Sequence, residues 1–258
     1  MVNETTCHDQ IIEMRGVSKS FGSQKVLEHL DLDIHRCETH VVLGPSGCGK
    51  SVLLKHITGL LSPDEGEILF EGEDITKFAR KKLFQMRMHF GMLFQGAALF
   101  DSMTVGENVA LPLTKHTAMN EKEIRRIVCE KLSLVGLTDV YDKYPAEMSG
   151  GMKKRIGLAR AVVMNPKVVL YDEPTTGLDP IMADVINELI CRLQRELDIT
   201  SVVVTHDIHS AYKVGNHIAM LHGGSIIFNG TPDEVRGTTH PIVRQFIEGR
   251  AEGPIRAV

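Results

Sequence analysis

The sequence contains no run of about 18 consecutive apolar residues, the length that a helix needs to cross a bilayer. Residues 1–10 are polar and lack the apolar segment of a secretory signal peptide. We therefore expect neither a transmembrane helix nor a signal peptide. If the protein serves a membrane, we expect it to act from the cytosol through a membrane-embedded partner.

No Cys-x-x-Cys pair is present, and the number of cysteines is odd. Disulfide frameworks and zinc sites usually need paired, regularly spaced cysteines, so we expect reduced thiols in a cytosolic compartment. One cysteine falls within a glycine-rich loop, where it is either a small filler residue or a reactive thiol. The five are Cys7, Cys37, Cys48, Cys129 and Cys191.

The chain also lacks a strong excess of one charge, since its formal net charge is −4 over 258 residues. Proteins that bind the nucleic-acid backbone usually carry a basic surface, so we expect no nucleic-acid partner. Hydrophobic residues make up 43% and charged residues 24%, which is typical of an ordinary globular protein. The length suits one large α/β domain, with or without a smaller insert.

Hydrophobic periodicity predicts strands and helices in both the first and the last third of the chain. The predicted strands are 11–14, 26–34, 39–43, 67–70, 88–94, 168–170 and 201–204, followed by a hairpin of 217–221 and 225–228 around two glycines. The predicted helices outside the middle of the chain are 52–60, 80–86, 181–197 and 240–248.

The middle of the chain has a helical pattern throughout, with predicted helices at 104–111, 120–135 and 149–164. Asn120 is a good N-cap, and Glu121 and Glu123 lie in the first turn, where the helix dipole favours acids. Residues of about 95–165 therefore form a predicted helical insert.

A glycine-rich loop from Gly44 to Ser51 follows a buried strand and precedes a helix. This is the context of a phosphate-binding loop, in which backbone N–H groups and the helix N-terminus face the phosphates. Lys50 would reach the β- and γ-phosphates, and Ser51 would bind Mg²⁺. A chance glycine-rich turn is the alternative. The predicted nucleotide-binding residues here are Gly44, Pro45, Ser46, Gly47, Cys48, Gly49, Lys50, Ser51 and Val52.

Two carboxylates end the apolar run at 168–171 and so lie at the C-terminal edge of a predicted strand, where α/β sheets bind ligands. Asp172 suits the Mg²⁺ shell through a bound water, and Glu173 is placed to act as general base on the attacking water. An exposed pair of acids without a function is the alternative.

A second glycine pair follows Ser149 at the start of a predicted helix and could bind another anion. One triphosphate does not need two such sites in one chain. Two chains facing head to tail would use both, with Ser149, Gly150 and Gly151 of one closing the nucleotide of the other. An ordinary serine N-cap is the alternative.

Together these segments resemble the motif set of ABC transporter ATPases, over about Ile11 to Glu248. The resemblance implies an α/β P-loop NTPase with a RecA-like, mostly parallel sheet core, an N-terminal antiparallel β subdomain and an inserted α-helical subdomain. It implies a single domain at 11–248, with its core at 11–94 and 166–248, its helical part at 95–165 and a tail at 249–258.

The resemblance also assigns roles to single residues. Phe21 is similar to the aromatic residue that stacks on adenine, although a core Phe before a turn is the alternative. Gln95 resembles the glutamine that touches Mg²⁺ and the attacking water, and Asp179 the aspartate that communicates across the dimer. His206 resembles the histidine that contacts the γ-phosphate. Catalysis would then rest on Glu173, His206, Lys50 and Gln95, and Mg²⁺ binding on Ser51, Gln95 and Asp172.

The loop at Ser149 to Gly151 corresponds to the signature loop of this family. It departs from the family's commoner sequence, because Met148 precedes it and Met152 follows it. This loop, residues 91–105 and the stretch from Val243 to Phe246 resemble the ATPase of Mla/Mce-type phospholipid transport systems. That resemblance implies a homodimer on the cytoplasmic side of the inner membrane, an MlaE-like permease contacting about Leu93 to Leu113, and an MCE-domain protein in the complex. The alternatives are an importer ATPase for a polar solute such as an amino acid, a soluble ABC ATPase acting on ribosomes or DNA, and a non-hydrolysing regulator.

The proposed permease-contacting stretch is unusually apolar. Phe94, Leu99, Phe100 and Met103 either line an exposed interface patch or fill the core of the helical insert.

Overall fold

The computed structural model describes residues 10–255, and the chain divides into two compact units. The first unit contains the residues up to Leu83 and those from Val202 onwards, and the second contains Phe84 to Ser201. Cys7 and the last three residues of the predicted tail lie outside the described residues. None of the other four cysteines is in a disulfide bond. No helix in the described range is long and apolar enough to span a membrane.

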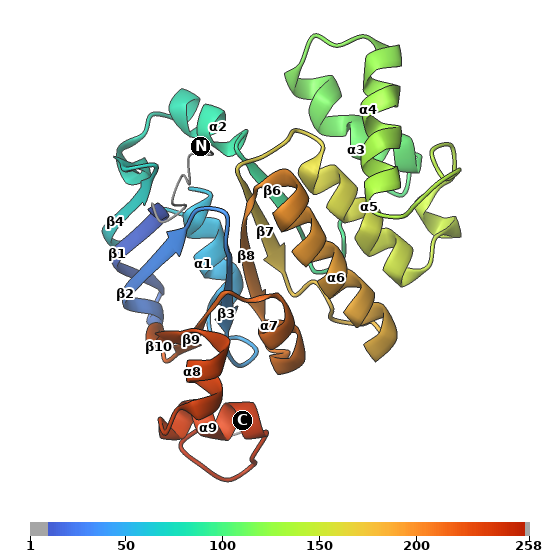
Figure 1. The fold of residues 1–258 in the computed structure, drawn as a ribbon. Helices are drawn as coiled ribbons and strands as arrows, with labels where there is room; N and C mark the ends of the chain where they lie inside the picture. Colours follow the sequence, from blue (N-terminus) through green and yellow to red (C-terminus); the bar gives the residue numbers. More distant parts are fainter. Residues whose placement is uncertain (1–9, 256–258) are drawn as a thin grey trace, which may run out of the picture. The chain divides into compact units, whose positions relative to one another are not determined.

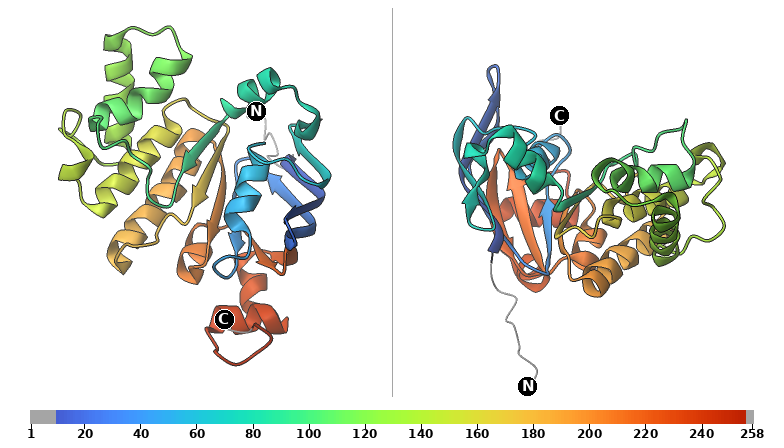
Figure 2. Two further views of the ribbon diagram at one scale, coloured as in Figure 1. Left: turned by 180° about the vertical axis from the view of Figure 1, so that it is seen from behind. Right: turned by 90° about the horizontal axis from the view of Figure 1, so that it is seen from above.

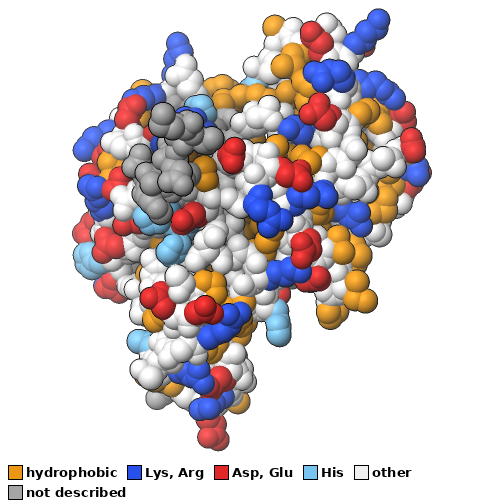
Figure 3. All heavy atoms as spheres, in the orientation of Figure 1, with side chains coloured by type: hydrophobic (Ala, Val, Ile, Leu, Met, Phe, Trp, Pro, Cys, Tyr) orange, Lys and Arg blue, Asp and Glu red, His pale blue; other side chains and the backbone are white. Residues whose placement is uncertain are grey.

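An antiparallel sheet forms one layer of the first unit, with its strands in the order β2-β1-β4-β5 (Figure 1). On the face shown in Figure 3, acidic and basic side chains are interspersed over this sheet. The strands are β1 (Gln10–Phe21), β2 (Gln24–His35), β4 (Glu65–Phe70) and β5 (Glu73–Asp74).

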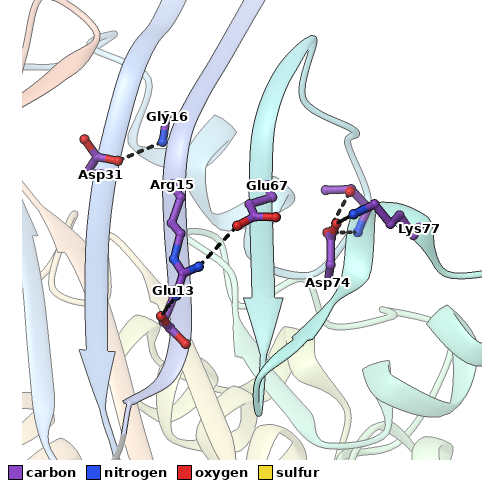
Figure 4. Close-up of polar contacts among 8 residues, drawn as sticks. Glu13, Arg15, Gly16, Asp31, Glu67, Asp74 and Lys77 are labelled. Atoms are coloured by element: carbon purple, nitrogen blue, oxygen red, sulfur yellow. Dashed lines mark hydrogen bonds and ion pairs between the residues drawn. The ribbon is translucent and has the colours of Figure 1, made fainter.

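β1 is longer than the strand predicted at 11–14, because a bulge at Gly16 hides its second half from a search for simple alternation. Gly16 has a φ of 58°, and Asp31 Oδ1 accepts a hydrogen bond from its N–H at 2.7 Å (Figure 4). Arg15 on the same strand pairs with Glu13 and with Glu67 of β4. Gly66 of β4 lies so close to the backbone of β1 that a Cβ on it would be 2.5 Å from two carbonyl oxygens of β1.

A second set of strands in the first unit has the order β10-β9-β3-β8, with β3 and β9 parallel and β9 and β10 an antiparallel hairpin as predicted. β3 (Thr39–Leu43) is buried at every position and has the predicted bounds. The other three are β8 (Thr200–Thr205), whose first two residues belong to the second unit, β9 (His217–His222) and β10 (Ser225–Gly230).

The helices of the first unit include two that were not predicted, α7 and α8, which are too short to show a helical period. Each is instead marked by its cap, Asp207 for α7 and Thr231 for α8. The set is α1 (Lys50–Ile57), η1 (Ile75–Lys77), α7 (Ile208–Val214), α8 (Pro232–Gly237) and α9 (Pro241–Glu248).

The second unit contains the parallel strands β6 (Phe90–Leu93) and β7 (Val168–Asp172). All regular elements between these two strands are helical, as predicted, and α3, α4 and α5 pack together (Figure 2). The helices are α3 (Val105–His116), α4 (Glu121–Leu134), η2 (Pro145–Glu147), α5 (Gly150–Val162) and α6 (Pro180–Leu197), while α2 (Arg80–Arg87) crosses the boundary between the units.

Two helix ends test the sequence rules directly. Asn120 caps α4 as predicted, and its side chain and that of Glu123 exchange hydrogen bonds with each other's backbone at 3.1 and 2.9 Å. α3 was predicted to end at residue 111, but it continues through Pro112 to His116.

Three histidine rings stack at one end of β3. The ring of buried His40 lies with its centroid 5.5 Å from that of His35 and 5.1 Å from that of His217. His40 Nε2 accepts a hydrogen bond from the His35 backbone at 2.9 Å, and the Glu38 carboxylate lies 3.5 Å from the same nitrogen. Burial, with a smaller effect from the other two rings, lowers the pKa of His40 to about 3.

We predict that His40 makes the protein sensitive to acid. A neutral His40 in the fold, against an ordinary pKa of 6.5 in the unfolded chain, contributes stability above pH 6.5 that is lost progressively as the pH falls towards 3. At pH 5 the loss is roughly 2 kcal/mol. His40→Gln keeps an acceptor for the His35 N–H but cannot be protonated, so its free energy of unfolding should fall less between pH 7.5 and 5. Urea unfolding at both pH values measures this, and equal falls would contradict it.

Candidate active site

The phosphate-binding loop predicted at Gly44–Ser51 connects β3 to α1 in the first unit. α1 begins at Lys50, two residues before its predicted start, and Gly49 caps it with a φ of 105°. Gly44 N–H donates to the Thr205 carbonyl of β8 at 3.3 Å, which fixes the start of the loop. A Cβ at Gly44 would lie 2.6 Å from the Leu221 carbonyl oxygen and 2.8 Å from Cys48 Sγ, so only glycine fits there.

Lys50 is buried although its side chain is charged. Its ammonium donates to the carbonyl oxygens of Gly44 and Pro45, at 2.8 and 3.0 Å, and so folds back over the loop. Ser46, Gly47 and Ser51 are exposed. The loop therefore presents a cation and accessible polar groups together.

His206 directly follows β8 and is exposed beside the phosphate-binding loop. It lines a pocket of about 390 Å³ together with Pro45 and Ser46 of the loop. Asp207 next to it caps α7, accepting from His209 N–H at 3.0 Å and from Ser210 Oγ at 2.5 Å. The first unit thus brings the loop and His206 together.

The segment after α9 lines the same pocket through Arg250, Ala251 and Ile255. The side chain of buried Gln245 holds this segment, donating to the Arg250 and Ile255 carbonyls at 3.2 and 2.9 Å and accepting from Ile255 N–H at 2.6 Å. Figure 1 shows the chain curving back towards α9 here. The sequence drew attention to the stretch from Val243 to Phe246 but did not predict this contact, which Gln245 makes with residues that follow α9.

Phe21 lies at the end of β1, and 47% of it is exposed. The ammonium of Lys19 lies 5.8 Å from the centre of its ring. The alternative of a core Phe is therefore wrong, and the ring is available for stacking.

In the second unit, Asp172 ends β7 and Glu173 follows it. Glu173 is buried and has a φ of 48°, a left-handed conformation that is uncommon for a residue other than glycine. Thr176 donates hydrogen bonds to both the backbone and the side chain of Glu173. Its N–H donates to the Glu173 carbonyl at 3.3 Å, and its hydroxyl donates to Glu173 Oε2 at 3.2 Å. Such strain in a carboxylate at a strand end is typical of functional sites.

Gln95 follows β6, and its side chain is exposed. Buried Lys154 of α5, which sequence reasoning missed, connects it to the acid pair. The Lys154 ammonium donates to the Gln95 carbonyl at 2.5 Å and to the Glu173 carbonyl at 3.3 Å. Burial lowers the pKa of Lys154, an effect that the negative charges of Asp172 and Glu173 oppose. The second unit thus brings Gln95 and Glu173 together.

Ser149 and Asp179 both serve as N-caps. Ser149 Oγ accepts from Met152 N–H at 3.3 Å at the start of α5, which is the ordinary role considered as the alternative. Asp179 accepts from Ile181 and Met182 N–H, both at 3.0 Å, at the start of α6. A Cβ on Gly151 would lie 2.3 Å from Met182 Cε, so the two helix starts pack closely.

Comparison with known proteins agrees with this geometry. The family described as ABC transporter matches residues 27–176. A probable ribonucleotide transport ATP-binding protein, mkl, of Mycobacterium leprae (strain TN) is 46% identical over 244 residues, which cover 95% of this chain and 70% of that protein.

The intermembrane phospholipid transport system ATP-binding protein MlaF of Haemophilus influenzae is 38% identical over 249 residues, covering 96% of this chain and 94% of MlaF. A dimeric structure of a post-hydrolysis state of the ATP-binding cassette MJ0796, bound to ADP and Pi, superposes with a TM-score of 0.78 at 32% identity, covering 86% of this chain and 98% of that one. The predicted family and fold class are thus confirmed. This chain belongs to the ABC transporter family, and it is an ATP-binding, ATP-hydrolysing subunit of an ABC transporter.

Proposed function

We propose that this subunit works as a homodimer that hydrolyses Mg²⁺-ATP to drive a membrane permease moving phospholipid between membranes. The observation that carries the hydrolytic part is Glu173, a buried carboxylate held in a strained conformation at the C-terminal end of β7. The similarity to MlaF supports the phospholipid part. The subunit then acts at the cytoplasmic face of the inner membrane, bound to its permease.

In the proposed reaction, the phosphate-binding loop holds the phosphates of ATP, and the Lys50 ammonium turns from its carbonyl acceptors towards the β- and γ-phosphates. Glu173 accepts a proton from water as the water oxygen attacks the γ-phosphorus, and the bond from that phosphorus to the ADP oxygen breaks. His206 contacts the γ-phosphate, and the exposed ring of Phe21 stacks on adenine.

The residues also fit Mg²⁺, because Ser51, Asp172 and Gln95 all offer the oxygen ligands that this ion prefers. When bound, the ion neutralises negative charge on the phosphates. Ser51 is exposed and Asp172 is partly exposed, so each can reach a ligand.

A second copy of the chain would complete the site in this proposal. Ser149, Gly150 and Gly151 open α5 with backbone N–H groups at a helix N-terminus, a position that favours an anion. Asp179, at the neighbouring helix start, would then communicate between the copies. The dimeric state of the MJ0796 cassette supports this arrangement.

The permease would bind near α3. Phe94 and Phe100 are 42% and 52% exposed, whereas Leu99 and Met103 are partly buried, so the apolar stretch is neither a pure core nor a uniform patch. Buried Asn108 holds the backbone that presents Phe100, accepting from its N–H at 2.8 Å and donating to its carbonyl at 3.0 Å. Phe94 also lines a hollow of about 240 Å³. Exposed aromatic side chains such as these two suit a protein interface, where aromatic residues are enriched.

A polar cargo is the second candidate, because the mkl protein is named for ribonucleotide transport. The proteins that co-purify with this subunit from membranes decide between the two. An MlaE-like permease with an MCE-domain protein supports phospholipid, and a permease for a polar solute contradicts it.

Replacing Glu173 by Gln removes the proposed base but keeps the shape of the side chain. We expect phosphate release by the membrane-derived complex to fall roughly 100-fold or more, while ATP binding is retained. Glu196→Gln, which changes an exposed acid of α6, is the matched control and should release phosphate like the wild type. Equal rates for Glu173→Gln and the wild type would refute the assignment.

Replacing Phe100 by Asp puts a charge at the centre of the proposed permease contact. We expect the amount of co-purifying permease to fall roughly tenfold or more, because buried aromatic anchors dominate such interfaces. Met119→Asp changes another exposed apolar residue of the second unit and should leave the permease bound. Undiminished recovery of the permease with Phe100→Asp would place the contact elsewhere.

A further inference from the structure

One face of α5 holds the loop that follows β6. Lys154, Gly157 and Arg160 recur at every third position and so lie on one side of the helix. A Cβ on Gly157 would lie 2.7 Å from Leu93 Cδ1 and 3.4 Å from Ala97 Cβ, so the absence of a side chain lets α5 approach closely. The two cations lie on either side of this contact.

The loop itself has an unusual backbone. Ala97 and Ala98 have φ angles of 59° and 47°, in the left-handed region that alanine seldom adopts. Arg160 donates to their carbonyl oxygens at 2.5 and 2.7 Å. Burial lowers the pKa of Arg160. The guanidinium thus stabilises a conformation that the loop sequence alone does not favour.

Lys154 also donates hydrogen bonds to backbone carbonyls, at the other end of the contact. It contacts two chain segments, the loop after β6 and the loop after β7. Its ammonium donates to the Gln95 carbonyl at 2.5 Å and to the Glu173 carbonyl at 3.3 Å. Glu173 has the same left-handed backbone, with a φ of 48°. One side chain of α5 therefore joins two loops that carry the proposed glutamine and general base.

We propose that Lys154 is a positioning residue for ATP hydrolysis, which fixes the backbone of Glu173 and of Gln95 relative to α5 through its two hydrogen bonds. The inference rests on the proposed function of Glu173. Lysine suits this position, because its ammonium has three donors and no acceptor on a flexible stem. Its contacts are to backbone carbonyls, so it sets where the loops lie and does not touch the reacting atoms.

Lys154→Met tests the inference, since methionine has a similar length and fills the space without donating hydrogen bonds. Lys131→Met is the matched control. Lys131 is also a buried lysine of the second unit, with its ammonium on a single acceptor, Asn165 Oδ1, at 2.8 Å, and burial lowers its pKa as it does that of Lys154. The full-length protein, in the complex that co-purifies with it, is assayed for kcat and KM of ATP hydrolysis and for its unfolding midpoint.

We expect Lys154→Met to lower kcat about tenfold or more, because small displacements of reacting groups are costly, and to change KM for ATP less than about threefold. Lys131→Met should lower the unfolding midpoint comparably and leave kcat within about twofold. Equal kcat values for the two variants, or a loss confined to KM, would overturn the proposal. If Lys154→Met does not fold, Lys154→Gln, which can donate to one carbonyl, is held to the same criterion.

The double variant Lys154→Met/Glu173→Gln separates this inference from the proposed function. If Lys154 acts through Glu173, Lys154→Met lowers the rate of single-turnover hydrolysis by a smaller factor in the Glu173→Gln background than in the wild type, since residues that act as a unit are not additive. Losses that multiply would contradict the inference. A Glu173→Gln variant as fast as the wild type would instead refute the proposed function.

Discussion

In each unit, backbone carbonyl oxygens of a loop accept hydrogen bonds from a buried or partly buried cation, and the loop conformations depend on this interaction. Lys50 is bound by carbonyls of its own loop, Lys154 by those of Gln95 and Glu173, and Arg160 by those of Ala97 and Ala98. A buried charge is costly unless it is fully hydrogen-bonded. Each cation therefore requires its loop to turn backbone carbonyls towards it.

Several features could be predicted because they depend on neighbouring residues only. A predicted buried strand that runs directly into Gly44 has the bounds of β3. The residue types at Asn120, Glu121 and Glu123 predicted the cap of α4, and the structure confirms it. The segments that carry the phosphate-binding loop and the acid pair were recognised by their order along the chain. β1 was underestimated because the Gly16 bulge shifts its register, which depends on Asp31 of the next strand.

The roles of Lys154 and Gln245 could not be predicted, because each depends on hydrogen bonds to loops whose backbone conformation the sequence does not specify. The sequence also left open whether Phe21 belongs to the core, and its exposure answers that question. Cargo is a different matter. The relatives named for ribonucleotide and for phospholipid transport each align with at least 95% of the chain, so this similarity does not distinguish the two cargoes.

The Gln245 contact makes residue 250 a useful position for a spectroscopic label. Gln245 fixes the backbone around Arg250, whose side chain is 68% exposed, and this residue lines one pocket with Pro45, Ser46 and His206. A small fluorophore attached there would sit on an ordered segment beside the phosphate-binding loop. Its emission would change as nucleotide enters and leaves, giving an optical record of occupancy in real time without a modified nucleotide.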